Sequence, residues 1–425
     1  MRLGDMDVNQ FLGRHWQRRP LLVRQALAGL TDASASAVQS PFSVRELFAL
    51  ARNPDIESRL VLAPVGSGTG NAGRPGDGGE TRAPRSSASS SAWRLRHGPF
   101  GRLPSRAQPG WSLLVQGVDL HLPAARTLMD RFRFLPDARL DDLMISFATD
   151  GGGVGPHVDS YDVFLLQVHG RRRWRIGPPA PFTLVPGAPL RILADFSVQQ
   201  DWLLEAGDML YLPPGWAHEG TAVGECMTCS IGFRSPSTSE LRQAFFGFLS
   251  DREPASPATS RTSLPSQRRY RDRTKQATRN PAEIPADMAG TLRGWLKDYR
   301  PPARLIDQFI GCYLTEPKPS VWFESRSDAR LPAGGDAGLA LDRRTRMLYR
   351  NGNYYINGEA LRAPRPGGAT AALLRALADR RGLDAVQTAR ALHQPWLRDR
   401  LGEWLASGWI VSRRLSPGEK RHAGL

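Results

Sequence analysis

Residues 155–177, "GPHVDSYDVFLLQVHGRRRWRIG", constrain the fold more than any other part of the chain. The segment begins with a histidine and an aspartate two residues apart, continues as an apolar run and ends in a cluster of arginines. Because alternate residues of a β-strand share a face, His157 and Asp159 are expected to point the same way. An imidazole and a carboxylate on one face are what two ligands of one metal ion need. The segment therefore predicts a strand that carries part of a metal site.

A second histidine completes the candidate ligand set. His218 follows a strand-like run at 208–212 and a Pro-Pro-Gly turn. Two histidines and one carboxylate on one face of a metal ion leave the opposite positions open, as in non-haem Fe(II) oxygenases. The Gly-rich stretch "DGGGVGP" before His157 also lets backbone approach such a site closely. We expect His157, Asp159 and His218 to bind one metal ion, and spacing alone leaves iron, manganese and nickel open.

The arginines of "RRRWRIG" alternate in the same way. Arg172 shares a face with Trp174 and Ile176, and the three neighbouring arginines share the other. The apolar face is the inward one, so the Arg172 side chain is predicted to be buried. A buried guanidinium is costly unless it is paired, and the adjacent sequence offers no obvious carboxylate. An acidic small molecule would satisfy it through bidentate contacts. The alternative is that all four arginines form a solvated edge.

The chain divides into three regions by pattern. Short runs rich in β-branched and aromatic residues, separated by Gly/Pro turns, indicate a barrel or sandwich over 141–233. We expect a β-rich domain over 1–237, a helical region over 238–325, and a winged-helix-like domain over 335–425 that contains two Asn-Gly turns. The Gly/Ser-rich residues 64–92 and the basic residues 251–285 lack periodic apolar positions. Both are predicted to be flexible inserts.

Composition narrows the setting. The formal net charge of +16 favours contact with a polyanion such as RNA, in part through the basic insert, although a solvated loop would also explain that insert. No signal-peptide pattern and no run of about eighteen apolar residues is found, so secretion and membrane insertion are not expected. Three cysteines are too few for a disulfide framework and suit a reducing cytoplasm. Cys226 and Cys229 fall on opposite faces of a strand, which argues against a zinc or redox pair.

Three segments carry a family resemblance: "DDLMISFATDGGGVGPHVDSYDVFLLQVHGRRRWRIG", "LEAGDMLYLPPGWAHEG" and "SIGFRSPS". They resemble the bacterial ribosomal-protein arginine hydroxylases, in the JmjC/cupin branch of the 2-oxoglutarate oxygenases. The resemblance implies a mixed fold, in which a double-stranded β-helix catalytic domain precedes a helical dimerisation segment and a winged-helix-like domain. It also implies Fe(II) bound by His157, Asp159 and His218, with 2-oxoglutarate held by the iron and by Arg172.

The implied reaction is hydroxylation of an arginine side chain on the sixteenth large-subunit ribosomal protein by a cytoplasmic homodimer, while 2-oxoglutarate decarboxylates to succinate. Ser146 and Ser230 are expected near the co-substrate, and Tyr161 and Asp162 at the substrate entrance. Thr228 departs from the family, in which an asparagine is expected at this position.

Two other functions remain open at this point. One is a JmjC oxygenase that acts on histidine or methyl-lysine of another protein, which product mass and residue localisation would distinguish. The other is a non-catalytic protein that grips RNA or DNA through its winged-helix-like end and basic insert. RNA affinity that survives loss of the metal ligands would favour the second.

Overall fold

The computed structural model describes residues 2–4, 6–26, 41–64, 93–251, 290–291, 294, 301–326, 328–332 and 337–414. The chain forms two compact units: Met1–Ser235 with Pro319–Trp322, and Pro236–Lys318 with Phe323–Leu425. The helical region groups with the C-terminal domain, and the three-domain boundaries stay a prediction. Nearly all of the two expected inserts lies outside the described residues, so their flexibility also stays a prediction.

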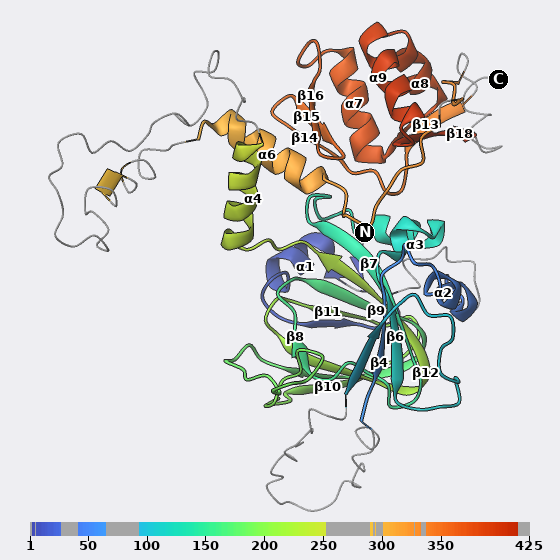
Figure 1. The fold of residues 1–425 in the computed structure, drawn as a ribbon, viewed down its shortest axis with the longest axis vertical. Helices are drawn as coiled ribbons and strands as arrows, with labels where there is room; N and C mark the ends of the chain where they lie inside the picture. The colour runs from blue at the N-terminus through green and yellow to red at the C-terminus, as the bar shows by residue number, and fades with distance from the viewer. Residues whose placement is uncertain are drawn as a thin grey trace, which may run out of the picture. The chain divides into compact units, whose positions relative to one another are not determined.

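The first unit is built on one antiparallel ten-stranded sheet that wraps into a barrel (Figure 1). Its path runs β3-β11-β9-β12-β7-β6-β4-β5, and β10 and β8 pair with β9 and β12. The strands are β3 (Leu21–Val23), β4 (Ser58–Leu62), β5 (Arg94–His97), β6 (Trp111–Val115), β7 (Leu140–Ala148), β8 (His157–Val158), β9 (Val163–Gly177), β10 (Gln200–Leu204), β11 (Met209–Leu212) and β12 (Ala217–Phe233). The β-rich domain expected from the short strands is confirmed.

The two longest strands, β9 and β12, pair with each other along both of their halves. The register shifts between Val223 and Met227, where the strands bend. Gly170 lies at this bend with φ +61°, and a Cβ there would come within 2.0 Å of the Glu225 carbonyl oxygen. Only glycine fits such a close approach in a left-handed conformation.

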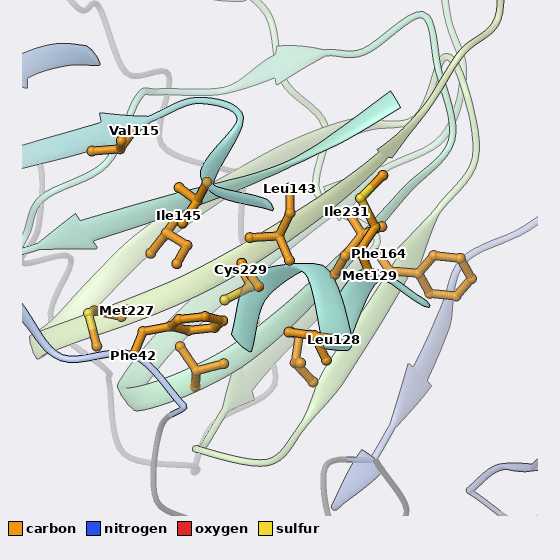
Figure 2. Close-up of a cluster of buried hydrophobic side chains, with 14 of the residues drawn as sticks. Phe42, Val115, Leu128, Met129, Leu143, Ile145, Phe164, Met227, Cys229 and Ile231 are labelled. Atoms are coloured by element: carbon orange, nitrogen blue, oxygen red, sulfur yellow. The ribbon is translucent and has the colours of Figure 1, made fainter. Parts of the chain in front are cut away.

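Helices cover one face of this sheet. The helices α1 (Val8–Arg14) and α2 (Val44–Leu50) each begin with a capping box, and the box expected from Ser43 and Glu46 is confirmed. Figure 2 shows how Leu128 and Met129 of α3 (Pro123–Asp130) gather with Leu143 and Ile231 of the sheet. Cys229 belongs to this core, and burial raises the pKa of its thiol. The core makes the sheet a rigid support for whatever lies on its other face.

The second unit contains a winged helix. The helices α4 (Thr238–Ser250) and α6 (Ala303–Thr315) precede β13 (Ala337–Leu341), β14 (Met347–Arg350), β15 (Asn353–Ile356), β16 (Glu359–Arg362), α7 (Ala369–Arg380), β17 (Gly382–Leu383), α8 (Ala385–Leu392), α9 (Pro395–Ala406) and β18 (Ile410–Arg414). Both expected Asn-Gly turns join strands, and all four of their residues have positive φ, as type I′ turns require. The expected winged-helix order is confirmed. No helix in the described ranges is long and apolar enough to span a bilayer.

The bend in β9 gives a stability prediction. Gly170→Ala is expected to lower the free energy of unfolding by about 3 kcal/mol or more, because the new methyl group meets backbone. Gly224→Ala is the matched control: this glycine also has positive φ (+72°), but a Cβ would meet nothing within 4 Å. The control is expected to cost about 1–2 kcal/mol. Urea unfolding of both variants measures the difference, and equal losses would contradict the proposed clash.

Candidate metal centre and its pocket

Two neighbouring strands and the loop that follows one of them bring three candidate ligands together. His157 on β8 pairs directly with His218 on β12, and their ring centroids lie 4.2 Å apart. The Asp159 Oδ2 atom lies 4.0 Å from His157 Nε2 and 3.5 Å from His218 Nε2. All three ligand atoms fall within 4.8 Å of one another, so one ion with bonds of about 2.1 Å would need only a small contraction. The sequence expectation that these three side chains meet is confirmed.

Backbone carbonyls orient both imidazoles. His157 Nδ1 lies 3.0 Å from the Gly155 carbonyl oxygen, and His218 Nδ1 lies 2.9 Å from that of Trp216. A carbonyl only accepts, so each Nδ1 carries the proton and donates it, which leaves each Nε2 lone pair for a cation. Burial and the neighbouring His157 lower the pKa of His218 to about 4, so its ring is neutral at pH 7. The donor set therefore fits a divalent metal ion.

The three residues open onto a cavity of about 420 Å³. This volume is in the range of small-molecule sites. The wall is formed by strands β4, β5, β6, β7, β8, β9 and β12, by the loops around β8, and by residues 189–191. The cavity thus occupies the face of the sheet opposite the helix-covered core.

Arg172 supplies a buried cation to the cavity, which Arg59 and Arg191 also line. Its side chain is buried, with 6% of the residue exposed, and Nε and Nη2 have no hydrogen-bond partner among the described residues. The solvated-edge alternative is therefore wrong for this arginine. On the opposite face, Arg173 pairs with Asp201 at 2.8 Å and Arg175 pairs with Glu219. A buried, unpaired guanidinium costs several kcal/mol, so the cavity is built to receive an anion.

Hydroxyl groups line the same cavity. Ser146, Ser230 and Thr228 all contribute to the wall, as expected for the two serines. The Thr228 hydroxyl donates to Gln167 Oε1 at 2.8 Å, and Gln167 lies opposite Thr228 where β9 pairs with β12. The threonine that stands where the family is expected to have an asparagine is therefore held by the neighbouring strand. Sequence reasoning missed Ser112, which also lines the cavity, because the run "WSLLV" reads as a purely apolar strand.

The two residues expected at the substrate entrance lie in different surroundings. Tyr161 lines the cavity with 40% exposure, and desolvation followed by the Asp159 and Asp142 carboxylates raises the pKa of its hydroxyl. The expectation for Asp162 is wrong, because its side chain is fully buried away from the cavity. It accepts hydrogen bonds from Tyr211 at 2.6 Å, Arg139 at 3.0 Å and Gln17 at 3.1 Å. Neighbouring residues of extended chain point to opposite sides, and only Tyr161 faces the cavity.

Comparison with known proteins supports the same fold. A family model described as "JmjC domain" matches residues 127–241, and one described as "ROXA-like winged helix" matches residues 296–410. The fold and the site therefore define a JmjC-type oxygenase barrel followed by a winged helix.

Among curated proteins, the chain is 40% identical to the "Ribosomal protein uL16 3-hydroxylase" of Escherichia coli over 57% of each chain. It is 32% identical to a "Probable ribosomal oxygenase" of Haemophilus influenzae over 54% of this chain and 50% of that protein. The aligned parts thus span about half of these relatives' length.

Solved structures extend the likeness to nearly the whole chain. The structure of YcfD, a ribosomal oxygenase from Escherichia coli, superposes with a TM-score of 0.71 and 30% identity over 97% of this chain and 99% of that one. A complex of YcfD with cobalt and 2-oxoglutarate gives a TM-score of 0.72 at the same identity and coverage. The chain belongs to the family of JmjC-domain ribosomal oxygenases.

The ligand geometry predicts the effect of removing its carboxylate. Asp159→Ala is expected to weaken binding of Co(II) or Mn(II) at least about a hundredfold, because only the two imidazoles remain and the negative charge is lost. Titration calorimetry measures the affinity, and circular dichroism shows whether the variant stays folded. Asp201→Ala, which removes a carboxylate from the exposed face of the barrel, is the control and should bind metal like the parent protein. Unchanged affinity in Asp159→Ala would rule out this ligand.

Proposed function

We propose that this protein is an Fe(II)- and 2-oxoglutarate-dependent hydroxylase that modifies an arginine side chain of the sixteenth large-subunit ribosomal protein. The observation that carries the proposal is one cavity with three converging metal ligands and an unpaired, buried Arg172. The names of the relatives supply the substrate class. A structure of YcfD in complex with cobalt and 2-oxoglutarate, which is similar to this chain over nearly its whole length, supports the choice of a divalent metal and of the co-substrate.

Each residue has a distinct task in this proposal. His157, Asp159 and His218 would hold Fe(II), and Arg172 would bind a carboxylate of 2-oxoglutarate and so orient the co-substrate. When bound, the iron and 2-oxoglutarate together activate oxygen for insertion into an unactivated C–H bond, and succinate and carbon dioxide are released. The apolar wall, which includes Leu165 and Trp174, excludes water from this chemistry.

An aromatic and an acidic side chain lie beside Gly232, near the cavity. Gly232 leaves open the space beside Asp142 and Tyr161: a Cβ on this glycine would lie 3.7 Å from Asp142 Oδ1 and 3.9 Å from the Tyr161 ring. Gln116 donates to the other Asp142 oxygen at 2.9 Å and so fixes the carboxylate. The Tyr161 ring, 40% exposed in the cavity wall, suits a guanidinium or a methylated ammonium through cation–π contact, so experiment separates arginine from methyl-lysine.

The charge excess points to a second partner. Residues 1–235 contain 25 Arg/Lys and 22 Asp/Glu, whereas residues 236–425 contain 32 and 19. The winged helix alone, residues 337–414, has 14 arginines and six acidic residues. A nearly balanced catalytic unit does not repel a basic substrate, and a strongly basic second unit suits RNA. We therefore propose that the second unit contacts ribosomal RNA. The protein would act in the cytoplasm as a homodimer, formed through the helical region, where Phe246 and Ile306 are exposed.

The reaction is tested by mass spectrometry of ribosomal proteins incubated with this protein, Fe(II), ascorbate and 2-oxoglutarate. We expect a gain of one oxygen on an arginine, absent when 2-oxoglutarate is omitted and absent with His218→Ala. Fragment spectra locate the modified residue and separate arginine from histidine. Oxygen gain on another residue, loss of a methyl group, or consumption of 2-oxoglutarate without either change would refute the arginine assignment. No consumption at all would refute the oxygenase.

The RNA contact is tested by fluorescence anisotropy with a ribosomal RNA fragment. Affinity is expected to fall steeply with salt, at least about tenfold between 50 and 200 mM. The double variant Arg362→Ala/Arg365→Ala, on the exposed surface of the winged helix, should bind RNA more weakly while its metal affinity stays unchanged. Arg173→Ala on the barrel is the control. Equal RNA affinity in all three proteins would remove the winged helix from the proposal.

A further inference from the structure

Strand β5 forms one end of the ten-stranded sheet. It pairs with β4 on one side, and no other strand in the described part of the chain pairs with its opposite edge. An edge strand presents a row of backbone N–H and C=O groups with which another chain can pair. The open edge of β5 is therefore a place where an extended peptide can add to the sheet.

The backbone hydrogen bonds show which residues of β5 face the open edge. The Gly98 N–H, directly after the strand, donates to the Ser58 carbonyl oxygen at 2.9 Å. Residues of an antiparallel strand turn their backbone groups alternately to one neighbour and to the other. The even-numbered residues of β5 therefore bond to β4, and Leu95 and His97 turn their N–H and C=O groups to the open edge.

The other side of β4 gives the same alternation. The Gln116 N–H donates to the Glu57 carbonyl oxygen at 2.9 Å, and the Ala63 N–H donates to the Gly110 carbonyl oxygen at 2.7 Å. The odd-numbered residues of β4 thus bond toward β6, which leaves its even-numbered residues for β5.

The two residues that face the open edge also line the cavity. The side chains of Leu95 and His97 belong to the cavity wall, and so do those of their cross-strand partners, Val61 and Arg59. Cross-strand partners point to the same side of a sheet. In a strand added to the open edge, the residues opposite Leu95 and His97 would therefore direct their side chains to the cavity side of the sheet.

The remaining side chains of β5 restrict what can pair with it. Arg94 and Arg96 are exposed and point to the face opposite the cavity. Two copies of this chain paired through their β5 edges would bring arginine against arginine, and like charges on neighbouring strands are destabilising. The edge therefore suits a segment of a different protein, with uncharged or acidic residues at the positions that lie beside Arg94 and Arg96.

We propose that the open edge of β5 binds an extended segment of the protein substrate as an added strand, so that the target residue points into the cavity. The inference rests on the proposed function, because that function supplies a polypeptide substrate. Leu95 and His97 each offer one N–H and one C=O, so the edge makes up to four main-chain hydrogen bonds. These bonds select an extended backbone and leave the choice of target side chain to the cavity.

The first test is a scan of backbone N-methylation. Overlapping synthetic peptides of the sixteenth large-subunit ribosomal protein are titrated against the parent protein loaded with Co(II), with fluorescence anisotropy as the readout of Kd. The peptide that binds most tightly is then methylated at one backbone nitrogen at a time. Because methylation removes an N–H, we expect the Kd to rise about tenfold at alternate residues and to stay unchanged at the residues between them.

Leu95→Pro tests the edge from the protein side. Proline removes the Leu95 N–H, which faces away from β4, so the hydrogen bonds between β4 and β5 are kept. The matched control is Leu95→Ala, which removes the same side chain and keeps the N–H. We expect the Kd of the peptide to be about tenfold higher for Leu95→Pro than for Leu95→Ala, with the same Co(II) affinity and circular dichroism in both. Equal peptide affinity in two folded variants would overturn the inference.

The outcomes separate this inference from the proposed function. No peptide binding to the parent protein, or methylation effects without alternation, would overturn the inference, and the scan decides the question if Leu95→Pro does not fold. Alternating methylation effects without oxygen gain on ribosomal proteins would support the edge site and refute the function. A parent dimer that becomes monomeric in Leu95→Pro, as measured by light scattering, would assign the edge to a second copy of this chain and overturn the inference.

Discussion

The pairing of β9 with β12 is the interaction on which the site depends. These strands hydrogen-bond along both halves and bend together at Gly170. Because β8 also pairs with β12, one strand carries His218 and aligns His157 beside it. The same strand places Ala222 against Arg172. The positions of the metal ligands and of the cation are therefore set by one register, and a slip by one residue would turn all of them to the wrong face.

Local periodicity was enough to predict most of this arrangement. Alternation along a strand predicts that Arg172 points inward, because this depends only on neighbours in sequence. His157 and Asp159 converge as expected, but Asp159 lies in the loop after β8 and not on the strand that the alternation assumed. His218 was found through its turn context and the coordination chemistry. The barrel itself was predicted from the spacing of short strands, but its strand order was not, since nonlocal pairing leaves no local pattern.

The wrong expectation for Asp162 and the missed Ser112 have physical causes as well. Asp162 was assigned to the entrance because it neighbours Tyr161 in sequence, yet its partners Arg139, Gln17 and Tyr211 come from three distant segments. Ser112 was missed for the opposite reason: nothing in an apolar strand marks one serine as unpaired. Whether a buried polar group has a hydrogen-bond partner is a property of the tertiary structure. Sequence patterns therefore identify candidate polar groups but do not show which of them lack a partner.

Hydrogen-bond donors without a protein partner couple the stability of the fold to the binding of an anion in the cavity. The Arg172 guanidinium and the Ser112 hydroxyl lower the stability of the ligand-free protein, since each is removed from bulk water without gaining a partner among the described residues. The protein affords this because a large core on the opposite face of the sheet supplies the stability. An anion that binds only the folded state recovers the cost and stabilises the fold by RT ln(1 + [L]/Kd). The same donors that destabilise the ligand-free barrel are therefore the source of its affinity for an anion. A substitution that gave either donor a hydrogen-bond partner within the protein would stabilise the fold and weaken anion binding.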